Sequence, residues 1–435
     1  MKTVAFNTLG CKVNQYETEA MMEIFEKRRY KIVNTSDKAD VYVINTCTVT
    51  NLGDRKSRQF IRRSKKKNPE AIIAVVGCYA QISSDEVLDI PEVDVIVGTN
   101  NRNKIVDLCE EAKEKNKRIN VVKSIMDVKE FEDLSIAEIK GKTRASLKIQ
   151  EGCNRYCSYC IIPYARGPIR SRDLDKILDE VRRIADNGFK EIVLTGIHVA
   201  SYGKDLGDIR LIDVIEEVHK IEGIERIRLS SIEPTIITDE FMERLVKLPK
   251  VCDHFHLSLQ SGSDTVLERM NRKYTTSQYK SIVEKIRKYM DNVAITTDII
   301  VGFPGETDKE FNETYEFVKD IGFSKIHVFK YSKRQGTPAA KFKNQVNGNV
   351  KNDRSKKLID LGDNLTKNFN SKFIGKKVGV LFENRYNKES NYIIGHTTNY
   401  ITVLAESEND FEGEIIQVEI KDIKEDGLLG EIIIK

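Results

Sequence analysis

The chain has 435 residues, of which 40% are hydrophobic and 32% are charged, and its net charge is +4. This length indicates two to four domains, and the composition is that of a globular chain with an adequate core. No apolar run approaches a membrane span and no signal peptide is evident, so we expect a cytoplasmic protein without a membrane partner. In such a reducing compartment the 8 cysteines are better interpreted as metal ligands than as disulfides.

Residues 1–115 alternate strand and helix patterns. The apolar runs at residues 39–46 and 71–77 are typical of strands buried on both faces of a parallel sheet. We expect a parallel α/β domain over residues 1–115 and a charged linker over residues 116–140. The predicted strands are residues 3–9, 39–46, 71–77 and 93–97, and the predicted helices are residues 13–27, a basic helix ending near residue 67 and a helix ending near residue 114.

A second strand–helix series begins near Thr143. Six strands with intervening helices predict a partial (β/α)6 barrel over residues 141–371, with its active site at the C-terminal ends of the strands. The predicted strands are residues 145–150, 191–195, 224–230, 255–260, 293–301 and 325–330. The predicted helices are residues 174–187, 209–221, 239–248, 276–290, 308–321 and 353–370.

The tail, residues 372–435, alternates short β runs with Gly and Asn turns, which predicts a small β-barrel. These runs are residues 377–383, 392–396, 401–405, 414–420 and 430–434. The expected fold class is therefore α/β, with a parallel N-terminal domain, a central partial barrel and a small C-terminal β-barrel. The tail pattern fits an RNA-binding appendage and a purely structural domain about equally well.

The most informative motif is a C-x3-C-x2-C run of Cys153, Cys157 and Cys160, directly after the first strand of the predicted barrel. Three thiolates on one short loop can hold three irons of a [4Fe–4S] cluster. The fourth iron then lacks a protein ligand, and an open metal position is where a small molecule binds and is activated. Three structural cysteines would acquire this spacing only by accident.

Three further cysteines, Cys11, Cys47 and Cys78, each lie just beyond the C-terminal end of one of the first three strands. Ligands of open α/β sheets bind at that edge, so these thiols could hold a second cluster. Their wide spacing leaves buried, unreactive cysteines open as an alternative. We assign Cys109 and Cys252 to packing.

The C-x3-C-x2-C loop, with Tyr159 before its last cysteine, resembles that of the radical S-adenosylmethionine (SAM) enzymes. The resemblance implies that the open iron binds SAM. An electron from the cluster then cleaves SAM to a 5′-deoxyadenosyl radical, which abstracts a hydrogen from the substrate.

The order of the three domains is similar to that of the methylthiotransferases over essentially the whole chain. Residues 10–19, 44–50 and 76–81 resemble the three N-terminal motifs of that family. The resemblance implies that the tail is a TRAM-like RNA-binding barrel. It also implies two [4Fe–4S] clusters with six catalytic cysteines, Cys153, Cys157 and Cys160 for the cluster that binds SAM and Cys11, Cys47 and Cys78 for an auxiliary cluster.

Polar residues and glycines at the ends of the predicted barrel strands are candidates to bind SAM. Glycines there let the backbone approach a ligand closely, although Gly302 and Gly305 would also suit ordinary tight turns. His254 and His256 alternate on one strand and are predicted to be packing or supporting groups rather than iron ligands. The candidate cofactor-binding residues are Gly196, His198, Glu233, Gln260, Arg172, Asp298, Gly302 and Glu306.

The run Thr195-Gly196-Ile197-His198 indicates the branch of the family. It resembles the branch that converts N6-threonylcarbamoyladenosine at position 37, next to the tRNA anticodon, to its 2-methylthio derivative. The same chemistry on isopentenyladenosine of tRNA, or on an aspartate of a ribosomal protein, is the nearer alternative. A non-enzymatic iron–sulfur protein that binds RNA or senses iron is the more distant one.

The partners expected from this resemblance are a tRNA anticodon loop and an electron donor such as flavodoxin or ferredoxin; the sequence does not identify the sulfur donor. Residues 55–67 are densely basic, and such clusters attract phosphate backbones, although a solvated helix face would have the same composition. The candidate RNA-binding residues are Arg58, Arg62, Arg63, Lys65 and Lys66.

Overall fold

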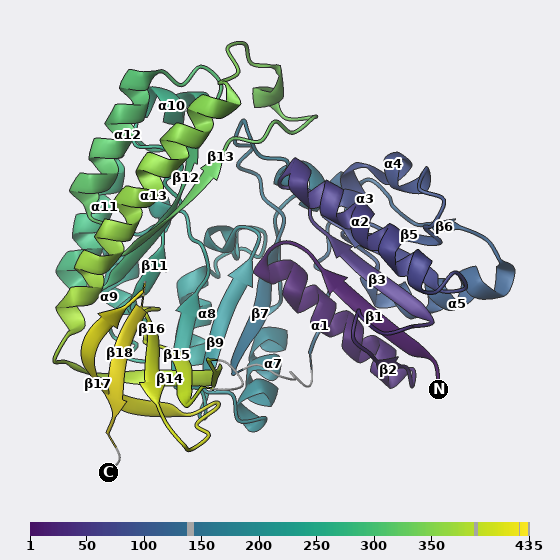
Figure 1. The fold of residues 1–435 in the computed structure, drawn as a ribbon, viewed down its shortest axis with the longest axis horizontal. Coiled ribbons are helices and arrows are strands. Elements are labelled where there is room, and N and C mark those ends of the chain that lie inside the picture. The colour runs from purple at the N-terminus through teal and green to yellow at the C-terminus, as the bar shows by residue number, and fades with distance from the viewer. Residues whose placement is uncertain (137–142, 387–389, 426, 434–435) are drawn as a thin grey trace.

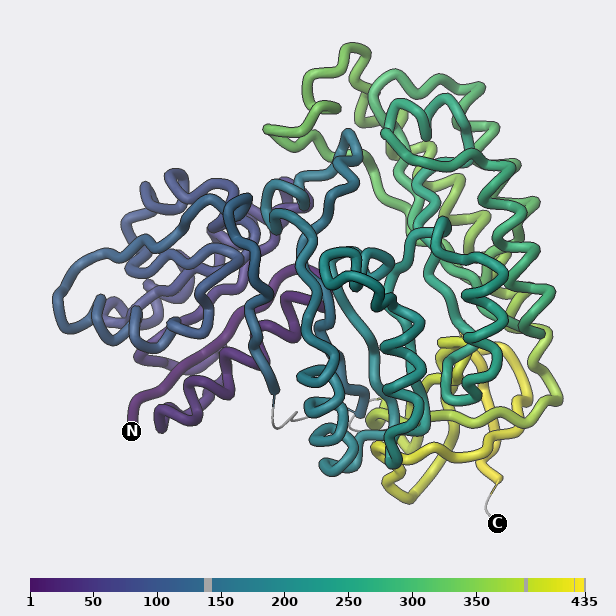
Figure 2. Tube along the Cα trace, turned by 180° about the vertical axis from the view of Figure 1, so that it is seen from behind, coloured from purple at the N-terminus to yellow at the C-terminus, as the bar shows by residue number. Residues whose placement is uncertain are grey.

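The structure is a computed structural model that describes residues 1–136, 143–386, 390–425 and 427–433. Its three parts are an N-terminal α/β layer structure, a central half-open barrel and a small C-terminal β-barrel (Figure 1). The same arrangement is seen from behind, where the N-terminal part lies on one side of the central barrel and the C-terminal part beneath it (Figure 2). Within the described residues, no helix is long and apolar enough to cross a membrane.

The N-terminal part is a parallel sheet of strand order β2-β1-β3-β4-β5-β6. Side chains alternate between its faces, so Val43 packs with α1 and α5 while Ile44 packs with α2 and α3. The strands are β1 (Thr3–Thr8), β2 (Lys31–Ile32), β3 (Val41–Thr46), β4 (Ile72–Gly77), β5 (Val95–Val97) and β6 (Ile119–Asn120). The helices are α1 (Lys12–Lys27), α2 (Asn51–Lys67), α3 (Cys78–Ile82), α4 (Ser84–Leu88), η1 (Arg102–Lys104) and α5 (Ile105–Lys115).

Strands β2 and β6 were not expected, because two residues are too few to show a periodic pattern. Strand β6 and the short helix η2 (Ile125–Asp127) lie within residues 116–140, the segment predicted to be a linker. Leu134 and Ile136 of that segment are buried in the core of the central barrel. The remaining predicted linker residues, 137–140, lie outside the described residues.

The central part has six parallel barrel strands in two sheets, β10-β9-β7 and β11-β12-β13, joined by isolated bridges, with β8 antiparallel on the free edge of β7. The fold class expected from the sequence is confirmed here and in the tail. The strands are β7 (Arg144–Glu151), β8 (Arg170–Ser171), β9 (Glu191–Gly196), β10 (Arg226–Leu229), β11 (His254–His256), β12 (Ala294–Val301) and β13 (Lys325–Lys330).

Helices cover the outer face of this barrel because each carries one apolar stripe, such as Ile177 and Val181 of α7. Gly362 of α13 lies so close to Ile326 of β13 that an added Cβ would be 2.6 Å from that side chain. The helices are α6 (Ile162–Arg166), α7 (Leu174–Asp186), η3 (Val199–Ser201), α8 (Leu211–His219), η4 (Pro234–Ile236), α9 (Asp239–Leu245), α10 (Asp264–Arg269), α11 (Thr276–Tyr289), α12 (Asp308–Ile321), η5 (Pro338–Lys341), α13 (Gly348–Asn370) and η6 (Ser371–Phe373).

The tail forms a closed barrel of strand order β14-β15-β16-β18-β17. Its strands β14 and β15 pack against the N-terminal ends of the central strands, where Arg226 donates to the carbonyls of Gly379 and His396 over 2.9 and 3.0 Å. The small barrel therefore closes the lower end of the central one. Its strands are β14 (Lys377–Arg385), β15 (Tyr392–His396), β16 (Thr402–Glu406), β17 (Ile415–Lys424) and β18 (Gly427–Ile432).

Candidate active site

The C-x3-C-x2-C motif lies on a loop directly after β7. Gly152 begins this loop at φ +72°, and a Cβ there would lie 1.8 Å from the carbonyl oxygen of Pro168, so only glycine fits. Farther along, the amide of Ser158 donates to the carbonyl of Met270 over 3.0 Å. The loop that carries the three cysteines is thus anchored at the C-terminal end of the first barrel strand, where the sequence predicts the active site.

The thiols of this loop are largely buried, and an arginine lies beside one of them. Burial raises the pKa of Cys153 to about 11 and that of Cys160 to about 12. Arg272 donates from Nη1 to the Sγ of Cys157 over 3.4 Å. An arginine N–H directed at a cysteine sulfur is the kind of hydrogen bond that supports the sulfurs of a bound cluster.

Two predicted SAM-binding residues, His198 and Glu233, come together beside this loop. Nε2 of His198 lies 3.2 Å from Oε2 of Glu233, and Arg155 of the cysteine loop contacts the same carboxylate. Burial opposes ionisation of Glu233, but His198 and Arg155 hold its pKa below the ordinary value. Gly196 lies at the end of β9, against Gln150 of β7. Gly196, His198 and Glu233 therefore line the strand ends around the cysteine loop.

Two other predicted SAM-binding residues, Arg172 and Gln260, have contacts of their own. Arg172 is buried against Glu180, 2.5 Å away, and Asp133, 2.7 Å away, on the side of α7. These ion pairs fix the position of the Arg172 guanidinium beside α7. Gln260 lies just after β11 with a positive φ of +76°, and its amide donates to the carbonyl of Asp298 over 2.9 Å.

Gly302 and Glu306 connect the turn after β12 to α13 and are separate from the group around the cysteine loop. Oε1 of Glu306 accepts from the amide of Gly302 over 2.9 Å and from Arg354 of α13 over 2.6 Å. Gly302 has a φ of +70°, and a Cβ there would lie 2.3 Å from the Lys351 side chain. Both residues thus fix the turn after β12 against α13.

The second set of cysteines lies at the C-terminal edge of the N-terminal sheet. Cys11 follows β1, Cys47 follows β3 and Cys78 opens α3 after β4, and these three strands are neighbours in the sheet. A Cβ on Gly10 would lie only 3.0 Å from the Cβ of Cys47, so the loops after β1 and β3 touch. Tertiary structure therefore gathers three thiols that are 36 and 31 residues apart in the chain.

A buried ion network joins this edge to the central barrel. Arg166 of α6 donates from Nε to the Sγ of Cys78 over 3.2 Å and from Nη1 to Glu17 over 2.7 Å. Lys148 pairs with Glu17 at 3.0 Å and with Glu151 at 2.9 Å. Burial raises the pKa of Cys78 to about 12, and Arg166 opposes this shift. The network fixes the two sets of cysteines relative to each other.

Three thiols in each set are the donor type that a [4Fe–4S] cluster requires. In the described part of the chain, no three His, Cys, Asp or Glu side chains converge on a point that could hold one metal ion. A [4Fe–4S] cluster is bonded through a different iron to each thiolate, so its ligands stand around a larger body. Each set offers three thiols and one buried arginine N–H directed at a sulfur, Arg272 in one and Arg166 in the other. Hydrogen bonds to sulfur of this kind tune such clusters.

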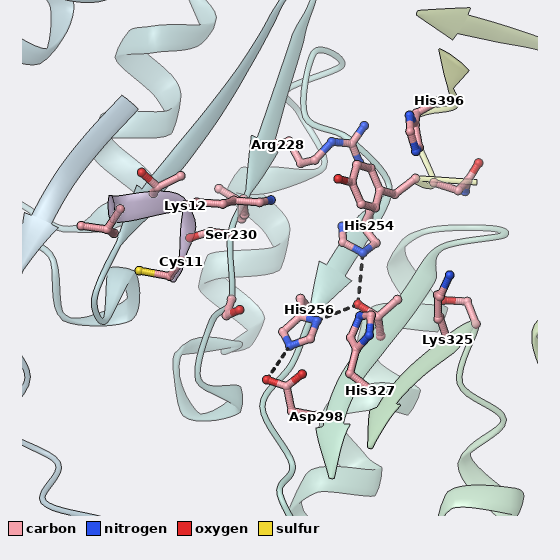
Figure 3. Close-up of a pocket in the computed structure, with 18 of the residues that line it drawn as sticks. Cys11, Lys12, Arg228, Ser230, His254, His256, Asp298, Lys325, His327 and His396 are labelled. Atoms are coloured by element: carbon pink, nitrogen blue, oxygen red, sulfur yellow. Dashed lines mark hydrogen bonds and ion pairs between the residues drawn. The ribbon is translucent and has the colours of Figure 1, made fainter. Parts of the chain in front are cut away.

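A cavity of about 860 Å³ lies inside the central barrel, between the N-terminal part and the tail. It reaches from Ile162 and Gly196, near the loop of Cys153, to the β15–β16 loop. Cys11, directly before α1, is among its lining residues, and strands β10 to β13 supply the opposite wall (Figure 3). His254 and His256, predicted as packing or supporting groups, line this cavity and share Thr296 as a hydrogen-bond partner at 3.1 and 3.0 Å.

The basic helix α2 presents only part of its predicted RNA-binding set to solvent. Arg62, Arg63 and Lys66 are exposed. Arg58 instead donates to Tyr79 and pairs with Glu86, both at 2.9 Å. Lys65 donates to the carbonyl of Ala71 over 2.8 Å and pairs with Asp94 at 3.1 Å. Three of the five candidates are therefore free to meet a phosphate backbone.

Sequence reasoning missed the residues at the lower end of the cavity, Lys12, Arg228, Ser230 and Tyr400. Lys12 is visible in the sequence beside Cys11, but only the fold shows that it faces the barrel. Arg228 lies on β10, whose inward face could not be distinguished by pattern, and Ser230 follows that strand directly. Tyr400 comes from the tail, and no local signal connects it to the barrel.

A partial barrel with a three-cysteine loop after its first strand and a cavity at its centre defines a radical SAM enzyme. The family model of the Radical SAM superfamily matches residues 147–318, and that of the Uncharacterized protein family UPF0004 matches residues 3–98. The solved structure of the radical S-adenosylmethionine methyltransferase TsrM from Kitasatospora setae shares this fold. It has a TM-score of 0.57 at 14% identity and covers 78% of this chain and 77% of its own.

Curated relatives define the family more closely. The chain is 48% identical to the threonylcarbamoyladenosine tRNA methylthiotransferase MtaB of Bacillus subtilis over 97% of its length and 94% of the relative. It is 42% identical to MtaB of Aquifex aeolicus over 95% and 99% of the two chains. It is 37% identical to the tRNA-2-methylthio-N(6)-dimethylallyladenosine synthase of Clostridium botulinum strain Loch Maree over 98% and 95%. The chain belongs to the radical SAM methylthiotransferase family, whose enzymes use SAM and two [4Fe–4S] clusters.

Proposed function

We propose that this enzyme replaces the C2 hydrogen of N6-threonylcarbamoyladenosine at position 37 of tRNA with a methylthio group. The observation that carries the proposal is the 48% identity to the MtaB of Bacillus subtilis over nearly the whole chain, against 37% to a dimethylallyladenosine synthase. The C2–H bond of adenine is neither acidic nor activated, so acid–base catalysis by side chains would not suffice.

Each set of cysteines would hold one cluster, Cys153, Cys157 and Cys160 the one that binds SAM and Cys11, Cys47 and Cys78 the auxiliary one. When bound, SAM and the clusters supply the radical, the sulfur and the methyl group. The group of Gly196, His198 and Glu233 beside the first set would orient SAM.

The chain's own part is to position the reactants and to exclude water. Arg166 and Arg272 place a positive charge beside Cys78 and Cys157. The cavity wall from β9 to β13 encloses the base, and a dry site prevents loss of a radical to solvent. Phe329 lines the cavity with half of its side chain exposed, so its ring is available to stack on an unpaired loop base.

The RNA would lie across α2 and the small C-terminal β-barrel. Arg62, Arg63 and Lys66 supply an exposed basic surface on a helix that begins four residues after Cys47. We assign residues 1–115 to the auxiliary-cluster domain, 141–371 to the radical SAM core and 372–435 to the TRAM-like domain. An electron donor such as flavodoxin or ferredoxin would reduce the clusters in the cytoplasm, where tRNA is modified.

The test is nucleoside mass spectrometry of tRNA from cells with and without the gene. We expect loss of 2-methylthio-N6-threonylcarbamoyladenosine and accumulation of its precursor without the methylthio group. Loss of the isopentenyl counterpart instead would keep the chemistry and change the substrate. If all tRNA nucleosides are unchanged, the tRNA assignment is wrong and ribosomal proteins become the substrates to examine.

A further inference from the structure

The lower end of the cavity carries an unusual charge for a purine-binding site. Lys12, Arg228 and His254 face it, and Tyr400 closes it from the tail. Lys12 and Arg228 both approach the Tyr400 ring, at 5.7 and 4.7 Å from its centroid. We call these four residues with Ser230 the cationic end. An apolar isopentenyl group would gain little from such a wall, because its burial would desolvate charged groups without pairing them.

Within the cationic end, the Lys12 ammonium is the positive charge that a ligand could pair with. Arg228 is held by Glu191, with Nε 2.7 Å from Oε1, and by the carbonyls of Thr397 and Thr398. Asp298, the acid on the cavity wall, lies beside His256 at 3.3 Å. No carboxylate among the residues that the structure describes lies within ion-pair distance of Lys12. Its ammonium therefore faces the cavity with an aromatic ring as its neighbour.

Two further polar atoms of this wall also lack a partner. The hydroxyl of Ser230 and Nδ1 of His254 are buried and make no hydrogen bond to any described residue. An unsatisfied buried polar group costs about 1–3 kcal/mol, so native structures rarely keep one without a reason. A polar ligand or water at this end would account for both atoms.

The cationic end lies where it could meet the N6 substituent of a base whose C2 is near the auxiliary cysteines. Cys11 and Lys12 are consecutive residues at the start of α1, and their side chains leave it in different directions, with Lys12 extending toward the strands of Arg228 and His254 (Figure 3). In a purine, C2 and C6 are separated by one ring nitrogen, so their substituents diverge. A base whose C2 faces the side of Cys11 would direct its N6 substituent along the wall that Lys12 occupies.

We propose that the cationic end binds the carboxylate of the N6 substituent, with the Lys12 ammonium as the anion-binding group and Ser230 as a hydrogen-bond donor. This proposal rests on the proposed function and names how its substrate is distinguished from an isopentenyl base. The threonylcarbamoyl group carries a carboxylate, a hydroxyl and a urea, which match the available donors. A site built to pair a substrate charge discriminates strongly against an analogue that lacks it.

The experiment uses the full chain with both clusters reconstituted and two anticodon stem-loop RNAs. One carries the free threonylcarbamoyl carboxylate and the other its carboxamide, which keeps the shape and removes the charge. Binding is measured by fluorescence anisotropy without reductant, and KM and kcat are measured under turnover. We expect wild type to bind the acid roughly 10- to 100-fold more tightly than the amide, as for a hydrogen bond to a charged group.

Lys12→Met should lose this preference through KM, with kcat at saturation changed much less, and Lys12→Arg should restore most of it. Because Lys12 adjoins Cys11, iron content is measured for each variant. Ser230→Ala, on a different element, should weaken binding of the acid about tenfold and that of the amide less. Loss of iron in Lys12→Met would leave Ser230→Ala to decide the question.

The subsite assignment is overturned if wild type binds acid and amide equally, or if Lys12→Met and Ser230→Ala weaken both RNAs by the same factor. That last result would mean a contact to phosphate or a structural effect. The proposed function fails separately, if wild type converts neither RNA. Discrimination between acid and amide without turnover would keep the carboxylate subsite and reject the reaction assigned to it.

Discussion

Arg166 donates from Nε to the Sγ of Cys78 over 3.2 Å, although the two residues are 88 positions apart. The other nitrogens of this guanidinium are held by Glu17, Glu151 and Asn14, at 2.7, 3.1 and 2.6 Å. Glu17 and Glu151 thus orient the Arg166 guanidinium so that its Nε–H points at the Sγ of Cys78. A barrel residue that follows the first set of cysteines therefore stabilises the second set.

Arg166→Lys should lower the midpoint potential of the auxiliary cluster and weaken its retention. Lysine keeps the charge but cannot hold two acids and a sulfur at once, and loss of an N–H to sulfur disfavours the reduced, more negative state. Redox titration followed by EPR, with iron content, measures both effects. Arg102→Lys is the matched control, because Arg102 also pairs with Glu17 but makes no hydrogen bond to a sulfur among the described residues. Equal shifts in both variants would assign the effect to the network as a whole.

Cys153→Ala and Cys47→Ala should have different phenotypes. Loss of Cys153 removes a ligand of the SAM-binding set, so we expect no reductive SAM cleavage. Loss of Cys47 removes an auxiliary ligand, so SAM cleavage should persist without methylthio product. Iron per chain and 5′-deoxyadenosine yield measure these outcomes. The control is Cys109→Ala, a buried thiol of α5 that should retain full iron. Product formation by Cys47→Ala would contradict the two-cluster assignment.

Replacing Arg62, Arg63 and Lys66 together by Gln should weaken tRNA binding at low salt and flatten its salt dependence. Each lost phosphate contact removes about 0.7 from the slope of log K against log salt, so the slope should fall by about two. Anisotropy titrations at several salt concentrations give this slope. Lys309→Gln with Lys319→Gln, on α12, removes exposed lysines away from this surface and should leave the slope unchanged. An unchanged slope in the α2 variant would remove the helix from the interface.

Glu310 should make the fold of the central barrel sensitive to acid. Burial opposes its ionisation, but hydrogen bonds from Arg269, Thr265 and Thr307 lower its pKa to about 2. A pKa below the ordinary 4.5 contributes stability above that pH, which is lost as the pH falls toward 2. Solvent screening reduces the contribution to about 1–2 kcal/mol.

Glu310→Gln should therefore lower the urea midpoint at pH 7, and the difference from wild type should shrink between pH 5 and pH 3. Unfolding followed by circular dichroism at each pH measures it. Glu316→Gln on the same helix is the control, because Glu316 is exposed and lies 3.9 Å from Lys319. A difference that does not shrink between pH 5 and pH 3 would mean that packing, rather than ionisation, accounts for the effect of Glu310.

Much of this protein could be predicted locally. The C-x3-C-x2-C loop could be predicted as a cluster site because its three cysteines lie within eight residues and need no tertiary contact to come together. Helix α12 was predicted with its observed bounds, Asp308–Ile321, and the structure shows that Thr307 and Glu310 form a capping box at its start. The two-residue strands β2 and β6 were missed because they form only by pairing with neighbours.

The sequence by itself determined the fold class, the first set of cysteines and, through resemblance, the family. Only the tertiary structure decided which side chains from distant parts of the chain contact each other. Arg172 and Glu306, predicted as candidates to bind SAM, pair with Glu180 and Arg354, which no local pattern indicated, because a buried charge needs a counter-charge wherever the fold supplies it. Lys12, in contrast, has no carboxylate within ion-pair distance among the described residues, and its ammonium lies beside the Tyr400 ring. Local sequence sets which groups carry charge, but burial and long-range packing decide which of them are neutralised and which stay available to a ligand.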